Sequence, residues 1–174
     1  DTLQTDAGTK ITLGDGGLFN QALQNIVNAD DSYEYGSCQN RMSVINTPAG
    51  LFWISQNQGK IFNYGEGLTD ITQSGMKWWF DEFLPYKLLE DFPNFELQDN
   101  TVIGIGCQSI YDNSNTVVYF TKRDFKLRPE FRGNITYVGD DLFKSERGGE
   151  FRLGDPRYFD SASWTVSYDP KSQA

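Results

Sequence analysis

The chain has 174 residues, a formal net charge of -9 and no histidine. A chain this acidic repels phosphate over most of its surface, which excludes non-specific nucleic-acid binding. The lack of histidine excludes Ser-His and Cys-His nucleophile pairs, and two cysteines, Cys38 and Cys107, are too few for a disulfide framework. No apolar run approaches the roughly 18 residues of a membrane span.

The first 34 residues are polar and rich in glycine and threonine, so residues 1–34 are predicted to form a polar N-terminal segment. Within them, Lys10–Leu13 is strand-like, and the apolar spacing from Leu18 to Val27 supports a short amphipathic helix at best. Residues 35–174 are predicted to form a β-rich domain. Because the chain begins without methionine and stops within a strand-and-turn pattern, this domain is expected to be part of a larger protein.

A first hairpin is predicted after a candidate strand at Arg41–Ile45. Leu51–Ser55 and Lys60–Tyr64 are apolar runs separated by four polar residues that end in glycine, which is typical of two antiparallel strands and their turn. A second glycine turn precedes a short extended piece at Leu68–Ile71.

Residues 74–91 contain a short helical segment inserted between the strands. Helical spacing relates Met76, Trp79, Phe80 and Phe83, and Ser74 is the expected N-cap. Pro85 is expected to end or kink this helix. Because Trp78 and Trp79 are adjacent, at least one of them must point away from the local core.

A second hairpin is predicted from Val102–Tyr111 and Thr116–Thr121. The five cations of Thr121–Gly133 alternate with acidic and apolar residues, which favours a solvated loop face over a binding patch. A strand is predicted at Asn134–Val138, and the stretch 145–160 is expected to be a loop with turns.

The last predicted strand is Ser163–Tyr168, where Trp164, Val166 and Tyr168 alternate with polar residues. Asp169 and Pro170 fit the first two positions of a type I turn. The chain is expected to lack the return strand of this hairpin. An apolar strand without a partner exposes backbone groups along its edge, so it should pair elsewhere in this chain, with another subunit or with another fragment.

These three strand-and-turn units recur at intervals of about fifty residues, a spacing typical of β-propeller blades. The predicted fold class is therefore mainly β, with antiparallel hairpins in propeller-like blades and the helical insertion near residues 74–91. A different mainly β arrangement with an inserted helix remains the alternative.

Three acidic pairs are the only candidate catalytic residues, at Asp81–Glu82, Glu90–Asp91 and Asp140–Asp141. Glycoside hydrolysis requires two carboxylates that face each other in a cleft, and the sequence singles out no such pair. Asp6 and Asp15 lie near glycine turns but do not match the spacing of an EF-hand loop. We expect no enzymatic activity, no metal site and no cofactor.

The four tryptophans, Trp53, Trp78, Trp79 and Trp164, are the candidate site residues. Their rings are suited either to anchoring a protein interface or to stacking on sugar rings. The first use favours a structural subunit. The second favours a carbohydrate-binding β-domain of a secreted or surface protein, with a host surface glycan as its partner.

Several stretches resemble the tail structural proteins of crAss-like bacteriophages, called muzzle proteins, which are related in role to the nozzle proteins of other short-tailed phages. The resemblance spans about residues 35–171, in "YGSCQNRMSVINTPAGLFWISQNQGKIFNYGEGLTDIT", "GMKWWF", "CQSIYDNSNTVVYFTKRDFKL" and "SWTVSYDPK". It implies a non-enzymatic virion component located in the tail, which assembles with copies of itself and other tail proteins around the DNA exit channel. This chain is far shorter than those proteins.

Overall fold

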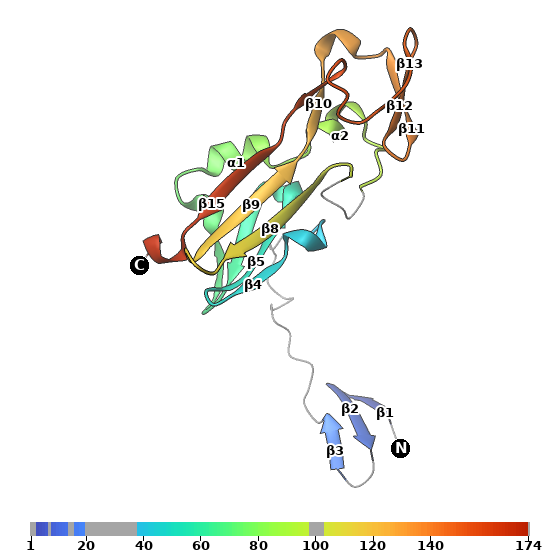
Figure 1. Cartoon of the computed structure of the whole chain (residues 1–174). Helices are drawn as coiled ribbons and strands as arrows, with labels where there is room; N and C mark the ends of the chain where they lie inside the picture. The colour runs from blue at the N-terminus through green and yellow to red at the C-terminus, as the bar shows by residue number, and fades with distance from the viewer. Residues whose placement is uncertain (1–2, 7, 14–15, 20–37, 98–102, 174) are drawn as a thin grey trace. The chain divides into compact units, whose positions relative to one another are not determined.

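The computed structural model describes residues 3–6, 8–13, 16–19, 38–97 and 103–173 (Figure 1). The backbone contacts divide the chain into two compact units, Asp1–Glu34 and Tyr35–Ala174. The described part of the chain is mainly β, and its sheets are antiparallel, as the sequence predicts.

The first unit contains a three-stranded antiparallel sheet in the order β1-β2-β3. Its strands are β1 (Leu3–Asp6), β2 (Gly8–Leu13) and β3 (Gly16–Phe19). The strand predicted at Lys10–Leu13 therefore exists and begins two residues earlier. Leu18 belongs to β3 rather than to a helix, and the remainder of the predicted amphipathic helix lies outside the described residues.

A four-stranded meander begins the second unit, in the order β4-β5-β6-β7. Its strands are β4 (Ile45–Thr47), β5 (Gly50–Ser55), β6 (Lys60–Tyr64) and β7 (Leu68–Asp70). The first predicted hairpin is confirmed, with the 3-10 turn η2 (Gln56–Gln58) and left-handed Gly59 between its strands. The strand predicted at Arg41–Ile45 is wrong, because Arg41–Ser43 forms the 3-10 turn η1, in which the Ser43 N–H donates to the carbonyl of Asn40.

The second sheet has the order β15-β9-β8. It contains β8 (Gly106–Asp112), β9 (Val117–Arg123) and β15 (Trp164–Tyr168). The predicted second hairpin is confirmed, although its first strand begins only at Gly106, because Gly104 has a positive φ and bends the chain. The last predicted strand is also confirmed, and its partner within this chain is β9. The second and third predicted hairpin units thus share one sheet.

The strand predicted at Asn134–Val138 is confirmed as β11 (Ile135–Gly139), which forms a three-stranded sheet with β12 (Leu142–Ser145) and β13 (Gly149–Arg152). The loop predicted over 145–160 is wrong, because it contains β13 and the start of β14 (Phe159–Ser161), which pairs with β10 (Phe125–Leu127). These strands are three to five residues long, and each of them except β11 contains a charged residue among its apolar residues. Phe143 and Phe151 are neighbours across β12 and β13, and both are buried in the core.

Two short helices follow the first sheet. They are α1 (Lys77–Phe83) and α2 (Leu88–Asp91), and the remaining 3-10 turns are η3 (Ile71–Gln73), η4 (Pro129–Phe131) and η5 (Pro170–Gln173). Ser74 does not cap α1, because it ends η3 and donates its N–H to the carbonyl of Ile71. As predicted, α1 ends just before Pro85.

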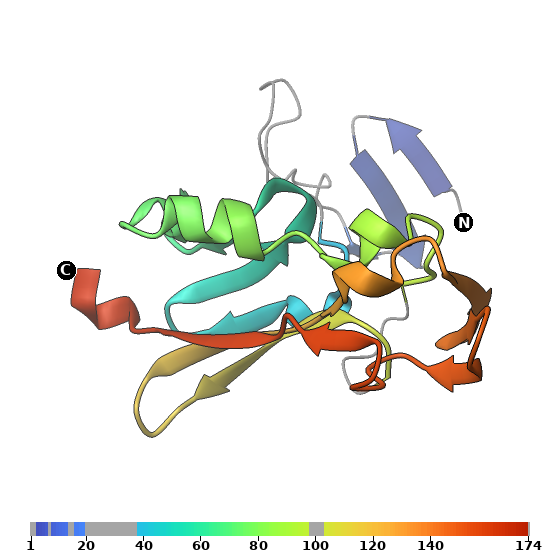
Figure 2. The same ribbon diagram turned by 90° about the horizontal axis from the view of Figure 1, so that it is seen from above.

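The sheet β4-β5-β6-β7 and the sheet β15-β9-β8 pack face to face (Figure 2). The ring of Phe52 on β5 lies 6.0 Å from that of Phe120 on β9 and 5.8 Å from that of Tyr168 on β15. A second aromatic group surrounds Phe143, whose ring lies 5.0 Å from Phe92 and 5.1 Å from Phe159. Both groups belong to one continuous hydrophobic core.

A buried ion pair joins the helices to the second sheet. The Lys122 Nζ lies 2.7 Å from the carboxylate of Asp124, and both side chains are inaccessible to solvent. Lys122 also donates to the carbonyls of Phe83 and Pro85, while Asp124 accepts the N–H groups of Lys87 and Leu88. The end of β9 therefore binds the C-terminal end of α1 and the N-terminal end of α2.

We expect Asp124→Ala to destabilise the fold by about 3–5 kcal/mol, because it leaves the Lys122 ammonium buried without its counter-charge. The change also removes the acceptor for the two N–H groups at the start of α2. Urea unfolding monitored by circular dichroism measures the loss. The matched control is Asp160→Ala, which breaks the exposed ion pair to Arg128 and should cost less than about 1 kcal/mol. Equal losses in the two variants would contradict the assigned role of the buried pair.

Candidate functional site

The structure places the four candidate tryptophans on three elements and brings only two of them together. Trp53 lies on β5 and stacks on Phe62, with ring centroids 5.3 Å apart. Trp78 and Trp79 lie on α1, and Trp164 begins β15. The rings of Trp79 and Trp164 meet edge to face at 5.1 Å.

This Trp79–Trp164 pair holds α1 against β15. The indole N–H of Trp164 donates to the carbonyl of Phe83 at 3.0 Å, and the ring of Phe80 lies 6.1 Å from that of Trp164. A ring with several aromatic neighbours and a hydrogen-bonded N–H contributes to the fold and presents little free surface. Trp79 and Trp164 therefore serve mainly as packing residues within this chain.

Trp78 is different, since 70% of its surface is exposed. Adjacent residues on a helix point about 100° apart, so Trp79 can pack on β15 while Trp78 faces solvent. Other large apolar residues of this region are also partly exposed, namely Met76 at 43% and Phe83 at 39%. Of the four candidates, Trp78 alone offers an open ring to a partner.

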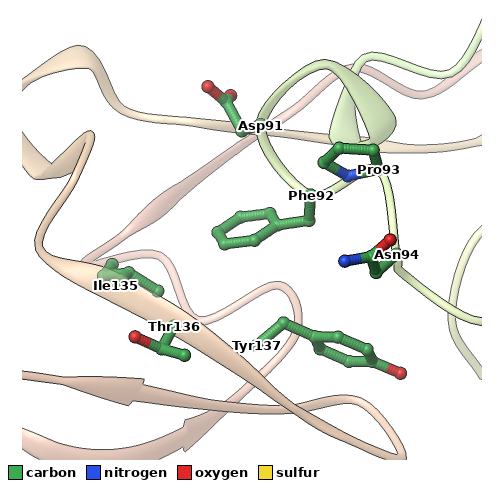
Figure 3. Close-up of a pocket in the computed structure, with 7 residues that line it drawn as sticks. All are labelled: Asp91, Phe92, Pro93, Asn94, Ile135, Thr136 and Tyr137. Carbon is green, nitrogen blue, oxygen red and sulfur yellow. The ribbon is translucent and has the colours of Figure 1, made fainter.

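A groove of about 270 Å³ lies between the end of α2 and strand β11 (Figure 3). Phe92 and Ile135 are its buried apolar residues, and Asn94 and Thr136 contribute exposed polar groups. The ring of Tyr137 completes the groove. It is held in place by Phe95 at 5.0 Å and by Phe143 at 5.3 Å.

Asp91 stands at the border of this groove. One carboxylate oxygen accepts from the guanidinium of Arg132 at 2.9 Å, and the other oxygen is buried without a hydrogen-bond partner in the described structure. An aromatic ring beside amide, hydroxyl and carboxylate groups can receive a small polar ligand such as a sugar. Sequence reasoning singled out only Asp91 here, because the two walls are separated by about forty residues.

The three acidic pairs lie at different places and have different surroundings. Asp81 pairs with Lys77 at 2.6 Å, and Glu82 and Glu90 both contact Lys87. Asp141 is buried, and burial raises the pKa of its carboxyl. Asp15 lies outside the described residues. Among the residues that the structure describes, no group of three or more side chains is arranged to hold a metal ion.

The basic stretch Thr121–Gly133 is not a solvated loop face. Lys122 is fully buried, while Arg128 and Arg132 pair with Asp160 and Asp91. The first part of the stretch belongs to β9 and β10. The prediction was wrong because the charge of a residue does not show whether its side chain is buried in the fold.

A buried polar cluster lies beside the ion pair at the centre of the domain. The hydroxyl of Tyr86 accepts from the Asn40 amide at 2.7 Å and from the Gln56 amide at 3.3 Å. The same hydroxyl is 3.9 Å from the sulfur of Cys107, which is a free thiol. Burial raises the pKa of Cys107 to about 11 and also raises the pKa of Tyr86.

No protein-family profile matches the chain, and no curated protein matches it. Within the parts of the chain that are described, no helix has the length and apolar character needed to cross a membrane.

We expect the contribution of Cys107 to the free energy of unfolding to fall between about pH 9 and pH 11. Because the folded-state pKa of Cys107 is about 11, the unfolded chain loses this proton at lower pH than the folded chain does. The unfolded state is then favoured as the pH rises, by about 2 kcal/mol at pH 11. Urea titrations at several pH values measure the effect. Cys107→Ser, which does not ionise in this range, should flatten the pH dependence; an unchanged slope would contradict the assignment.

Proposed function

We propose that this chain is a non-enzymatic structural component of a bacteriophage tail of the muzzle or nozzle type. In this role it packs against copies of itself and other tail proteins around the DNA exit channel. The proposal rests on the resemblance of residues 35–171 to muzzle proteins. The structural observation that carries it is Trp78, a large aromatic ring that is 70% exposed on a helix fixed to the core.

Exposed aromatic rings on rigid elements are the residues that most often anchor protein interfaces. α1 supplies such an element, because Lys122 and Trp164 both bind the carbonyl at its C-terminal end. Trp78 therefore needs no rearrangement of its helix before it meets a neighbouring subunit, which lowers the entropic cost of assembly.

The charge of the chain fits passage of DNA near the assembly. A net charge of -9 repels the phosphates of a passing duplex, so DNA would slide along such a wall without binding it. This repulsion favours a channel wall over a nucleic-acid-binding role.

The propeller-like arrangement also belongs to this proposal. The four-stranded meander β4-β5-β6-β7 has the strand order of one propeller blade. We propose that such meanders from several subunits, or from further parts of a larger protein, are arranged around a common axis in the assembled tail.

Particle composition tests the function. Virions should be purified from the phage whose genome encodes this chain, analysed by mass spectrometry, and labelled with gold-conjugated antibodies against the chain. We expect chain peptides in intact particles and gold at the tail end distal to the capsid. Peptides confined to the infected-cell lysate, or gold on the capsid, would contradict the proposal.

The second candidate is a carbohydrate-binding β-domain, favoured by the groove of Asn94, Thr136 and Tyr137 and by the open ring of Trp78. Aromatic rings beside hydrogen-bonding side chains are suited to sugar rings. A glycan array probed with the full chain tests it. Binding that is lost in Asn94→Ala or Trp78→Ala, and kept in the control Asn115→Ala on the β8–β9 turn, would support this function; an array without hits would reject it.

A further inference from the structure

We infer that strand β15 (Trp164–Tyr168) is a self-association edge, where a second copy of this chain adds its own β15 in antiparallel orientation. This contact deepens the proposed function and rests on it only for its biological setting. It would join the second sheets of two copies into one continuous sheet. The inference starts from how the two edges of that sheet differ.

One edge of the sheet is covered within the chain. β8 lies beside η1 (Arg41–Ser43), and the hydroxyl of Ser109 on β8 donates to the carbonyl of Ser43 at 2.7 Å. β15 forms the opposite edge and pairs with β9 alone among the strands that the structure describes. Figure 1 shows β15 as the outermost strand of this sheet. Among the described residues, β15 is therefore the edge of this sheet that lies open to an added strand.

The hydrogen-bond pattern shows which backbone groups of β15 point outward. Two residues before β15, the N–H of Ala162 donates to the carbonyl of Asp124, which is the residue opposite it when the β15–β9 register is extended by two residues. In an antiparallel ladder, hydrogen-bonded pairs alternate along the strand. The even-numbered residues of β15 thus bond to β9, and Thr165 and Ser167 direct their N–H and C=O groups away from the sheet.

The sequence of this edge has none of the residues by which proteins protect an open strand, while α1 packs on the inner-face side chain of Trp164. The segment from Ser163 to Tyr168 contains no charged residue, no proline and no glycine. Natural edge strands are usually shielded by charges, proline, bulges or a covering segment. An unshielded neutral edge in a chain of net charge -9 indicates a strand that pairs with another strand.

The sequence of β15 is complementary to itself. When two copies pair about Val166, that residue faces the second copy's Val166, and Trp164 faces the second copy's Tyr168 on the inner face. On the outer face, Thr165 faces the second copy's Ser167. Aromatic pairs and hydroxyl pairs across neighbouring strands are both stabilising, and the register brings no like charges opposite each other.

A cavity beside the edge supplies apolar surface to the inner side of this contact. It has a volume of about 170 Å³ and is lined by Val166, Ser167 and Tyr168 of β15 together with apolar residues of β6, η3, α1 and β9, among them Ile71 and Phe80. The apolar side chain at the centre of the second copy's strand would lie next to this cavity. Strand pairing would therefore bury apolar surface in addition to forming four backbone hydrogen bonds through Thr165 and Ser167.

Charge substitutions on the exposed outer face test the register. In T165K/S167K, lysines lie opposite each other in both outer pairs, whereas T165E/S167K puts a carboxylate opposite each lysine. Sedimentation equilibrium of the full chain should show a wild-type dimer. We expect a dissociation constant about tenfold higher in the double-lysine variant and close to the wild-type value in the charge-paired variant.

The overall repulsion between two chains of charge -9 adds a salt dependence. Added salt screens this repulsion, so the wild-type dimer should tighten as ionic strength rises. A wild-type chain that is monomeric at every concentration, or equal dissociation constants in the two variants, would overturn the inference. Circular dichroism confirms that each variant is folded.

Cysteine cross-linking gives an independent readout of the same register. Val166 lies on the two-fold axis of the inferred pair, in a non-hydrogen-bonded position where the two Cα atoms are close enough for a disulfide. In a Cys38→Ser background, Val166→Cys should form a covalent dimer on oxidation. Ser167→Cys, which faces Thr165 instead of itself, should not. Cross-linking of neither variant, or of both equally, would overturn the register, while the particle-composition test of the proposed function would stand unaffected.

Discussion

The buried pair of Lys122 and Asp124 is the contact on which the arrangement of this domain depends. α1 and α2 have seven and four residues, which is too short for a helix to be stable by itself in water. The end of each helix also leaves backbone groups without a helical partner. Lys122 binds the carbonyls at the end of α1, and Asp124 binds the N–H groups at the start of α2. The Lys122 ammonium meets the partial negative charge at the C-terminal end of α1, and the Asp124 carboxylate meets the partial positive charge at the N-terminal end of α2. The two side-chain charges also neutralise each other.

The positions of the aromatic residues follow from this attachment. The carbonyl of Phe83 accepts from both Lys122 and the indole of Trp164, so the same atom fixes α1 to two strands. With α1 held in this orientation, Trp79 meets Trp164 and the adjacent Trp78 must face solvent. The groove at Asp91 lies at the end of α2, so its position depends on the same pair of charges.

Features that depend on neighbouring residues were predictable from the sequence. The hairpin of Leu51–Ser55 and Lys60–Tyr64 was found because its turn and both strands lie within fifteen residues. The contact between Ser163–Tyr168 and β9 joins segments more than forty residues apart, and no local pattern shows it. The strand β11 was predicted from the apolar run at Asn134–Val138, whereas β12 and β13 were missed, because Lys144 and Glu150 interrupt their apolar pattern.

Lys122 and Asp124 were misread although the sequence contained a signal for them. In "VVYFTKRDF", Val118, Phe120, Lys122 and Asp124 occupy alternate positions, and alternate positions of a strand share one face. Two opposite charges on the face that Val118 and Phe120 share indicate a buried ion pair in a strand and not a solvated loop. The groove was harder to predict, since Asn94 and Tyr137 are brought together only by the packing of Phe95 and Phe143.

The same alternation explains how an acidic domain retains a neutral edge at β15. Along β15 the aromatic and apolar residues point into the core, so only Thr165 and Ser167 face outward between them. Charged residues resume on either side, at Asp160 and Asp169, beyond the ends of the strand. Two chains of the same sign repel each other least where their surfaces carry no charge, because the Coulomb energy falls with distance and is screened by salt. Along β15 the absence of surface charge coincides with unshielded backbone groups and an adjacent apolar cavity. Electrostatic repulsion therefore opposes the approach of another strand least at the place where that strand would bind most strongly.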